Sequence, residues 1–566
     1  MNETDETFDL VIAGSGGGGL VAALAAADAG LRAVVLEKQQ YVGGSTAMSG
    51  GVIWMPDNPL MRAEGVPDSF DDGMTYLQSV IGDPDDASSL ERRRAFLTAG
   101  PHMITLMQKQ GVELVRCDGY SDYYDNVEGG SARGRSVEGV PWDLKQLGPW
   151  RERIHPGMAR AIGLAVKTNE VRRISLFLRS PGYFASTARV VLRTRLSRLR
   201  GQDLVTNGMS LTGQLTKVLL DQGVPIRLNT PVRELLVEDG RVTGVRVESD
   251  GVSRTIRARH GVLLAAGGFE RDGEMRMKYS ANTQPNDGTH SRGNAGNTGE
   301  VLRAALALNA KSDYLDEAVW YLAPRSEMAG STLSLARQMP HTILVNNHGE
   351  RFVNESNSYV EVGKAMYAND AAPCWLVFDD AYRRSVPWLS GMPKLCHMTS
   401  AIPGRIPKEW VDKGWILMAP TVEELARRIE LDPARLRATV DRFNAGAAEG
   451  RDPDFGRGAS SYNQTLGDPG HKPNRALGTI ERAPFFATRI YPGDVGTMGG
   501  VVCDEHAQVL DADDTPIPGL YATGNMVATV MGRTYPGAGA SIAHTMVFGY
   551  VAARHIARTV RPGAGT

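Results

Sequence analysis

Apolar residues near the start of the chain follow the spacing of a strand, a helix and a second strand. Leu10 to Ala13 form a short apolar run, Leu20 to Ala27 are apolar and mostly helix-favouring, and Ala33 to Leu36 are apolar again. A glycine-rich stretch between the first two runs is typical of a tight turn. The pattern therefore predicts a βαβ unit over residues 8–39.

The same kind of pattern returns twice along the chain. Residues 214–248 predict a helix, a short strand and a hairpin that turns at Asp239-Gly240, and "GVLLAAGGFE" at 261–270 predicts a buried strand that ends in paired glycines. After about residue 316 the segments become rich in aromatic residues and punctuated by proline, which indicates a second domain. Strands and turns resume near 495, and a closing helix is expected over about 539–558.

The turn after the first strand carries a recognisable glycine spacing. Gly14, Gly16 and Gly19 form GxGxxG between strand and helix. The first glycine allows the turn, the second lets a pyrophosphate approach the backbone, and the third lets helix and strand pack closely. Glu37 ends the second strand 18 residues after Gly19, where an acidic residue would hold a ribose diol. The arrangement predicts dinucleotide binding; the alternative is a structural turn that binds nothing.

Composition excludes several classes of protein. The 566 residues carry a net charge of −2, which argues against nucleic-acid binding. Four cysteines, at 117, 374, 396 and 503, form no CxxC pair, and Cys396 beside His397 has no further ligand at useful spacing, so no metal site is expected. The acidic N-terminus has no apolar signal-peptide core and no run of about 18 to 20 apolar residues occurs. We therefore expect a cytoplasmic protein without a membrane span.

Several segments resemble FAD proteins of the fumarate reductase and ketosteroid dehydrogenase superfamily. They are "YVGGSTAMSGG" at 41–51, "TPVREL" at 230–235, "AAGGFE" at 265–270 and "GLYATGN" at 519–525. In that superfamily the first of them passes along the diphosphate and the flavin ring. Besides the three glycines and Glu37, the resemblance implies these FAD contacts: Gly43, Gly44, Ser45, Thr46, Gly50, Val232, Gly267, Gly524, Asn525, Ala540, Ser541 and Ile542.

The resemblance implies an α/β fold in which a Rossmann-type FAD-binding domain is split in sequence. We expect its parts at 1–147, 206–315 and 495–566. An α+β catalytic domain would be inserted at 316–494, and a basic amphipathic helical insertion would occupy 148–205. Within the superfamily, "GRTYPGAGASIAHTMVFGYVAA" at 532–553 resembles the 3-ketosteroid Δ1-dehydrogenases rather than the fumarate reductases, which carry an arginine-containing block there.

The Δ1-dehydrogenase resemblance implies four catalytic residues. The Tyr535 hydroxyl and the Gly539 amide would bind the steroid C3 carbonyl, because two donors stabilise the negative charge that builds on oxygen when the adjacent carbon loses a proton. Tyr359, in "RFVNESNSYVEV", would be the base that takes the C2 proton. Tyr123 would assist it, with adjacent Tyr124 as the alternative. A further alternative is that the tyrosine-rich loop only packs an aromatic face.

The implied reaction is desaturation of ring A of a 3-ketosteroid, with the C1 hydride passing to flavin N5. A quinone-like or other molecule would accept the electrons. Two alternatives stay open: a 3-oxo-5α-steroid 4-dehydrogenase of the same fold, and a noncatalytic flavin-binding subunit that docks on membranes.

Residues 151–200 depart from the family pattern and from the charge of the rest of the chain. They contain twelve Lys and Arg against two Glu, a local charge of +10, which leaves −12 elsewhere. Leu192, Leu196 and Leu199 share one helical face. We expect a helix pair around Pro181-Gly182 that docks on an anionic membrane, on the inner face of the cytoplasmic membrane, with preference or tolerance for cholest-4-en-3-one-like substrates. The alternative is a solvated basic face or a subunit contact.

Overall fold

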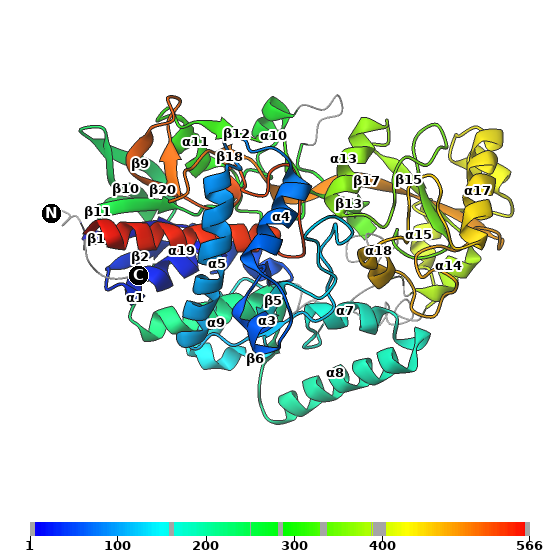
Figure 1. Ribbon diagram of the computed structural model, residues 1–566, viewed down its shortest axis with the longest axis horizontal. Helices are drawn as coiled ribbons and strands as arrows, with labels where there is room; N and C mark the ends of the chain where they lie inside the picture. Colours follow the sequence, from blue (N-terminus) through cyan, green and yellow to red (C-terminus); the bar gives the residue numbers. More distant parts are fainter. Residues whose placement is uncertain are drawn as a thin grey trace.

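The computed structural model describes residues 6–157, 163–249, 251–280, 287–328, 337–386, 388 and 403–560. Cys396 and His397 lie outside the described residues. Two lobes, each built on its own β-sheet, lie side by side, and a long helix stands away from both of them (Figure 1).

The first lobe is built on an eight-stranded sheet whose central strands run parallel in the order β20, β11, β1, β2, β8. β19 pairs with β20 at one edge, and the β9–β10 hairpin continues from β11. The strands span Glu6–Ala13 (β1), Ala33–Leu36 (β2), Ile226–Arg227 (β8), Val232–Glu238 (β9), Arg241–Ser249 (β10), Val252–Leu264 (β11), Gln508–Leu510 (β19) and Pro516–Ala522 (β20). One sheet is thus assembled from the beginning, the middle and the end of the chain.

Helices cover this sheet where the sequence is apolar. α1 (Gly17–Asp28) packs on α19 (Ala540–Val560) and α9 (Asn207–Asp221), and α5 (Leu90–Lys109) packs on α19 (Figure 1). α1 and α19 approach closely because both present glycine: a Cβ at Gly549 would lie 2.3 Å from the carbonyl oxygen of Gly18. The predicted βαβ unit, the hairpin at Asp239-Gly240 and the closing helix are confirmed.

The second lobe is built on an antiparallel sheet in the order β13, β17, β15, β14, with β16 also on β17. The strands span Ala318–Pro324 (β13), Thr342–Val345 (β14), Cys374–Phe378 (β15), Leu417–Ala419 (β16) and Phe485–Thr497 (β17). The helices around it are α13 (Tyr359–Ala368), α14 (Asp380–Ser385), α15 (Lys408–Asp412), α16 (Val422–Arg428), α17 (Pro433–Ala448) and α18 (Ser461–Leu466). β17 ends against the first lobe, where Thr497 Oγ1 accepts from the amide of Phe269, 3.2 Å away.

Shorter elements fill the junction between the lobes. β3 (Val52–Trp54), β5 (Ser136–Gly139) and β4 (Leu114–Arg116) form a small antiparallel sheet. Helices near it are α2 (Gly44–Met48), α3 (Pro59–Ala63) and α4 (Phe70–Ile81). α10 (Gly273–Tyr279), α11 (Glu300–Leu306), the two-stranded β12 (Ser312–Asp313) and β18 (Gly500–Val501), and the 3-10 turn η5 (Gly524–Met526) lie in the segments that connect the sheets.

The basic stretch forms α7 (Thr168–Ser175), a short turn and α8 (Pro181–Leu199). α8 is the helix that stands away from both lobes (Figure 1). The expected helix pair around Pro181-Gly182 is present, because α7 and the short turn precede Pro181, which is the first residue of α8 and is preceded by the N-cap Ser180. Proline suits that position, since the first helical amide has no acceptor to lose. Among the described residues, no helix is both long enough and apolar enough to span a bilayer.

Candidate active site

The turn between β1 and α1 is shaped by its glycines. A Cβ atom at Gly14 would lie 2.2 Å from the carbonyl oxygen of Ala265, and one at Gly19 would lie 2.1 Å from that of Gly14. At Gly16, by contrast, a Cβ would meet nothing within 4 Å. Gly14 and Gly19 therefore serve close packing, and Gly16 leaves open space for a ligand at the start of α1, where amide groups point outward.

Glu37 follows β2 and is buried beside this turn. Its carboxylate accepts from the Ser15 amide (3.0 Å) and hydroxyl (2.6 Å), and from the Gln39 amide (2.9 Å). These bonds fix the carboxylate at the end of the strand. It lines the same pocket as Gly16, as a ribose-binding acid must.

The pocket beside this turn runs over the carboxyl ends of β1, β2 and β11. Ten of the sixteen residues predicted for cofactor binding line it: Gly14, Gly16, Glu37, Gly44, Ser45, Thr46, Val232, Gly267, Gly524 and Asn525. Gly19, Gly43, Gly50, Ala540, Ser541 and Ile542 do not. The Thr46 hydroxyl accepts from the Gly17 amide at 3.0 Å and so ties α2 to α1.

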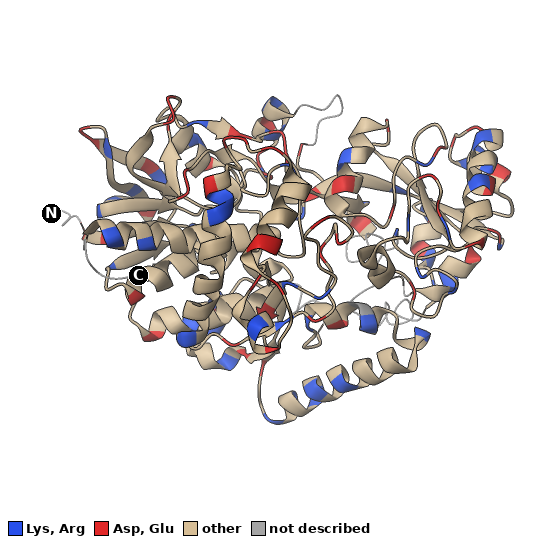
Figure 2. Ribbon diagram, in the orientation of Figure 1, with Lys and Arg blue, Asp and Glu red and all other residues tan. Residues whose placement is uncertain are grey.

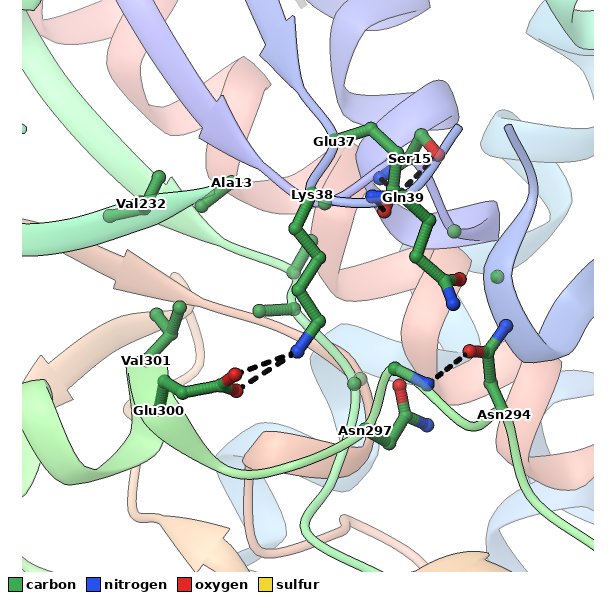
Figure 3. Close-up of a pocket in the computed structure, with 18 of the residues that line it drawn as sticks. Ala13, Ser15, Glu37, Lys38, Gln39, Val232, Asn294, Asn297, Glu300 and Val301 are labelled. Atoms are coloured by element: carbon green, nitrogen blue, oxygen red, sulfur yellow. Dashed lines mark hydrogen bonds and ion pairs between the residues drawn. The ribbon is translucent and has the colours of Figure 1, made fainter. Parts of the chain in front are cut away.

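The structure adds pocket residues that the motifs did not indicate. Lys38 reaches across the pocket to Glu300, with 3.0 Å between charged atoms, while Asn294 and Asn297 stand on the opposite wall (Figure 3). Asn297 Nδ2 lies 3.2 Å from the Ser45 hydroxyl and donates to Glu270 at 2.7 Å. The glycine and asparagine run "GNAGN" at 293–297 was the available signal, since such residues favour turns that expose backbone amides.

A smaller cavity continues from the first pocket toward the second lobe. The two share Gly524 and Asn525, and the smaller one is lined by Tyr535, Ser541 and His544. The glycine turn and Tyr535 thus line two cavities that adjoin at Gly524 and Asn525. This is the geometry that a long dinucleotide with a reactive ring at one end requires.

Two histidines, His341 and His544, have structural surroundings. The His341 Nδ1 lies 2.7 Å from the Thr479 carbonyl oxygen. His544 is 2% exposed, and a hydrogen bond with the Gly524 backbone opposes the effect of burial on its pKa. Burial lowers the pKa of His544 to about 3, so the ring is neutral.

Three tyrosines from distant segments meet at the end of this cavity. Tyr359 is the first residue of α13, Tyr535 lies in the loop before α19, and Tyr123 lies in the loop after β4. The ring centroids are 5.6 Å apart for Tyr359 and Tyr535 and 5.8 Å apart for Tyr123 and Tyr535. The hydroxyl oxygens of Tyr123 and Tyr359 lie 3.4 Å apart. The Tyr535 hydroxyl lies 3.2 Å from that of Ser541, in the first turn of α19.

Buried polar contacts hold the loop that carries Tyr123. The Tyr123 amide donates to the Pro536 carbonyl at 2.9 Å, and Asp122 accepts from Trp54 at 2.7 Å and from Arg135 at 2.8 Å. Tyr124 points elsewhere, because its hydroxyl donates to Glu361 at 2.8 Å. Of the two adjacent tyrosines, Tyr123 is therefore the one whose hydroxyl lies next to that of Tyr359.

The cluster is removed from water, which affects its acidity. Burial raises the pKa of Tyr123 and of Tyr359 well above the usual value near 10, and the neighbouring phenols add to it. The hydrogen bond with the Tyr123 hydroxyl lowers the pKa of Tyr359, because a donated hydrogen bond stabilises a phenolate. A fourth tyrosine, Tyr462 of α18, packs on Tyr123 with 4.6 Å between ring centroids.

Gly539 ends the loop that begins at Tyr535 and precedes α19. Its φ is +93°, and a Cβ there would lie 2.1 Å from the Val52 carbonyl oxygen. Only glycine fits, because both the left-handed backbone and the close approach of β3 exclude a side chain. Tyr535, at the start of the loop, lines the smaller cavity, whereas Gly539 is not among its lining residues.

Comparisons with known proteins agree with this architecture. The family model described as "FAD binding domain" matches residues 9–542. The 3-oxosteroid 1-dehydrogenase of Mycolicibacterium smegmatis is 39% identical over 574 residues, covering 98% of each chain. The 4-oxocyclohex-2-ene-1-carboxylate 5-dehydrogenase of Sinomonas cyclohexanicum is 34% identical and covers 97% of this chain and 94% of its own.

A solved structure matches equally well. The 3-ketosteroid delta1-dehydrogenase from Sterolibacterium denitrificans, in complex with 1,4-androstadiene-3,17-dione, superposes with a TM-score of 0.88 at 33% identity, covering 98% of this chain and all of the other. The fold and the pocket thus define an FAD-binding flavoprotein. The chain belongs to the 3-oxosteroid 1-dehydrogenase family, and its cofactor is FAD.

Proposed function

We propose that this protein introduces a C1–C2 double bond into ring A of 3-ketosteroids. The observation that carries the proposal is the meeting of Tyr123, Tyr359 and Tyr535 where the cofactor pocket ends. Its membership of the 3-oxosteroid 1-dehydrogenase family supports the choice of substrate. Bound FAD would supply the two-electron acceptor for the hydride that leaves C1.

The three tyrosines and Gly539 have different roles in the proposed reaction. The Tyr535 hydroxyl and the Gly539 amide donate to the C3 carbonyl oxygen, and each donor contributes about 3 kcal/mol as negative charge develops there. Tyr359, as phenolate, takes the proton from C2. The electron pair of that C–H bond becomes the new double bond as the hydride departs from C1. Tyr123 donates to the Tyr359 oxygen and stabilises its charged form.

Anaerobic mixing of the yellow protein with a 3-oxo-4-ene steroid tests the function. The proposal predicts loss of flavin absorbance and formation of the 1,4-diene. With a 3-oxo-5α-steroid, formation of a 4-ene would favour the 4-dehydrogenase instead. Bleaching by 4-oxocyclohex-2-ene-1-carboxylate but by no steroid would assign the substrate class of the Sinomonas relative. An unchanged spectrum with every ketone would support a noncatalytic subunit.

We also propose that α8, in the 148–205 insertion, docks on an anionic membrane. Half of the exposed large apolar side chains of the described chain lie on α8 and the turn before it: Leu178, Phe184, Val191, Leu192, Leu196 and Leu199. The opposite face, which packs on the protein, is formed by Ser186, Val190, Thr194 and Ser197. The polarity of the helix is therefore inverted, with its most apolar side turned to solvent. Such a face marks an interaction surface.

The positive charge of α8 favours an anionic partner. Arginine positions, blue in the ribbon of Figure 2, recur along α8, and no acidic residue lies among them. Glu170 of α7 is already paired with Arg193 at 2.6 Å. Arg189, Arg195 and Arg200 have no carboxylate partner among the described residues and are exposed. Basic residues beside an apolar stripe fit a bilayer with anionic headgroups, at about 1 kcal/mol for each basic residue near the surface.

Membrane docking would serve both substrates of the reaction. A steroid that keeps its sterol side chain partitions into the bilayer, and so does a quinone-like electron acceptor. We therefore propose peripheral association with the inner face of the cytoplasmic membrane, and acceptance of cholest-4-en-3-one-like substrates. The flotation experiment in the Discussion tests the docking independently of the enzyme reaction.

A further inference from the structure

Arg337 is a buried arginine next to the segment that carries Tyr359. It is 2% exposed, and its Nη1 donates to the main-chain carbonyl oxygens of Glu355 and of Asn357, the latter at 2.9 Å. These carbonyls precede Tyr359 by four and two residues. The guanidinium thus braces the backbone that leads directly into the proposed base.

The buried charges around Arg337 do not cancel. Arg351 pairs with Glu355 at 2.8 Å and with Asp452 at 2.9 Å, and Arg457 pairs with Glu355 at 3.1 Å. Within the described residues, no carboxylate forms an ion pair with Arg337. This buried network therefore contains the three guanidinium groups of Arg337, Arg351 and Arg457. It contains only two carboxylates, those of Glu355 and Asp452. Arginine stays protonated in proteins, so one buried positive charge is left without a match.

The groups that could carry the missing negative charge are the tyrosines. Tyr462, Tyr321 and Tyr123 are the phenols whose charge bears on Arg337, together with Glu355. Burial raises the pKa of Tyr462, and the positive charge of Arg337 opposes that effect. Tyr462 packs on Tyr123, whose hydroxyl lies 3.4 Å from that of Tyr359.

Two carboxylates lie beside the segments that carry Tyr123 and Tyr462. Asp122 pairs with Arg135 at 2.8 Å, and Asp125 accepts from the Ser461 and Tyr462 amides at 2.9 and 3.0 Å. Tyr120 and Tyr535 are among the phenols that raise the pKa of Tyr123. Glu361 accepts from the Tyr124 hydroxyl. Arg292 lies over the Tyr321 ring, 5.3 Å from its centroid. Arg337 is thus the buried cation that bears on Tyr462 and Tyr123 without a carboxylate of its own.

We propose that Arg337 is a positioning residue that supplies the counter-charge for a single phenolate shared by Tyr359, Tyr123 and Tyr462. The inference rests on the proposed function of Tyr359 as base. Burial alone makes a phenol a poor base at neutral pH, and an unmatched cation in a medium of low dielectric constant offsets that effect. Arg337 acts through the tyrosines and has no contact with substrate in this account.

Two substitutions distinguish the effect of the Arg337 charge from the effect of its hydrogen bonds to the backbone. Arg337→Lys keeps the positive charge but loses the guanidinium that bonds both carbonyls, whereas Arg337→Met loses the charge. We expect the alkaline rise in the rate of flavin reduction to stay near its wild-type pH in the Lys variant and to move up by about one pH unit or more in the Met variant. Near-ultraviolet tyrosinate absorbance of the holoprotein should show the same upward shift for the most acidic tyrosine.

Arg92→Met is the matched control. Arg92 is 1% exposed and donates to the carbonyl oxygens of Ala87 and Ala528, and the groups whose charge bears most on it are Cys503, Asp504, Tyr314 and Asp85. Its removal should destabilise the fold without moving either titration. Equal titrations for wild type and Arg337→Met, or equal shifts for the Lys and Met variants, would overturn the proposal. If no ketone bleaches the wild type, the enzyme function fails, and the tyrosinate titration still decides the role of Arg337.

Discussion

The phenol oxygens of Tyr123 and Tyr359 lie 3.4 Å apart, although the residues are 236 positions apart in the chain. The pair is buried, which raises the pKa of both phenols. The proton on this pair is therefore hard to remove, and the rate of flavin reduction should rise with pH across the alkaline range. The sign follows because only the ionised form accepts the C2 proton.

Tyr359→Phe should abolish that alkaline rise and lower turnover by at least about 100-fold, since loss of a base costs about 2.7 kcal/mol or more. Tyr535→Phe should lower turnover by a similar factor and keep the rise, because it removes an oxyanion donor. Both should retain FAD. Tyr124→Phe is the control, as its hydroxyl bonds Glu361. Near-normal turnover in Tyr359→Phe would refute its assignment as the base.

Glu37→Ala should weaken FAD retention without changing which steroids are accepted. The carboxylate is fixed by Ser15 and Gln39 at the ribose end of the pocket, and the tyrosines lie at the other end. The measurement is the flavin-to-protein absorbance ratio after purification and after dilution. Protein that stays equally yellow would contradict the predicted register of the βαβ unit.

Glu270→Gln should change how stability depends on pH. Burial, with the nearby charge of Asp494, raises the pKa of Glu270 from an ordinary 4.5 to about 7. Between these values the folded protein binds the extra proton, so the free energy of unfolding should fall as pH rises from 4.5 to 7. Glutamine cannot ionise, so the variant should not lose this stability as pH rises. Its free energy of unfolding relative to wild type should therefore be higher at pH 8 than at pH 5, by about 1 to 3 kcal/mol.

Thermal and denaturant unfolding of both proteins at several pH values make that comparison. Glu248→Gln, an exposed partner of Arg233, serves as the control and should show no such crossover. Parallel pH profiles for wild type and Glu270→Gln would mean that Glu270 is ionised in the folded protein.

Replacing Leu192, Leu196 and Leu199 together with glutamine should abolish flotation with anionic liposomes. These leucines are 58%, 40% and 84% exposed, so their loss should leave the fold and the activity on a water-soluble steroid intact. Wild-type flotation should weaken at high salt and on neutral liposomes. The control replaces three exposed apolar side chains elsewhere: Val237, Val252 and Met418. Equal flotation of the leucine variant and wild type would exclude α8 as the docking surface.

Local patterns in the sequence predicted much of the first lobe. Strand and helix periodicity places the βαβ unit, and the steric demands at Gly14 and Gly19 are those that the glycine spacing indicates. The three tyrosines that we propose as catalytic were predicted from resemblance, because no periodicity relates residues so far apart. In the structure the Tyr123 hydroxyl lies next to that of Tyr359, whereas the Tyr124 hydroxyl bonds Glu361.

Other features depend on contacts that no local pattern contains. Lys38 meets Glu300 across 262 residues, and Asn297 joins Ser45 to Glu270. The burial of His544 and of Arg337, each 2% exposed, arises from several segments at once. On α8 the sequence indicated an apolar face, but only the packing shows that this face is turned to solvent.

The most direct test of the central claim uses a 3-oxo-4-ene steroid that carries two deuterium atoms at C1 or, in a separate substrate, two at C2. The holoprotein is mixed with each substrate without oxygen, flavin absorbance is followed, and the product is examined by mass spectrometry. The account predicts a 1,4-diene that has lost one deuterium from whichever carbon was labelled, and slower flavin reduction with the C1 label. A product that keeps both labels, or flavin reduction without any loss from C1, would contradict it.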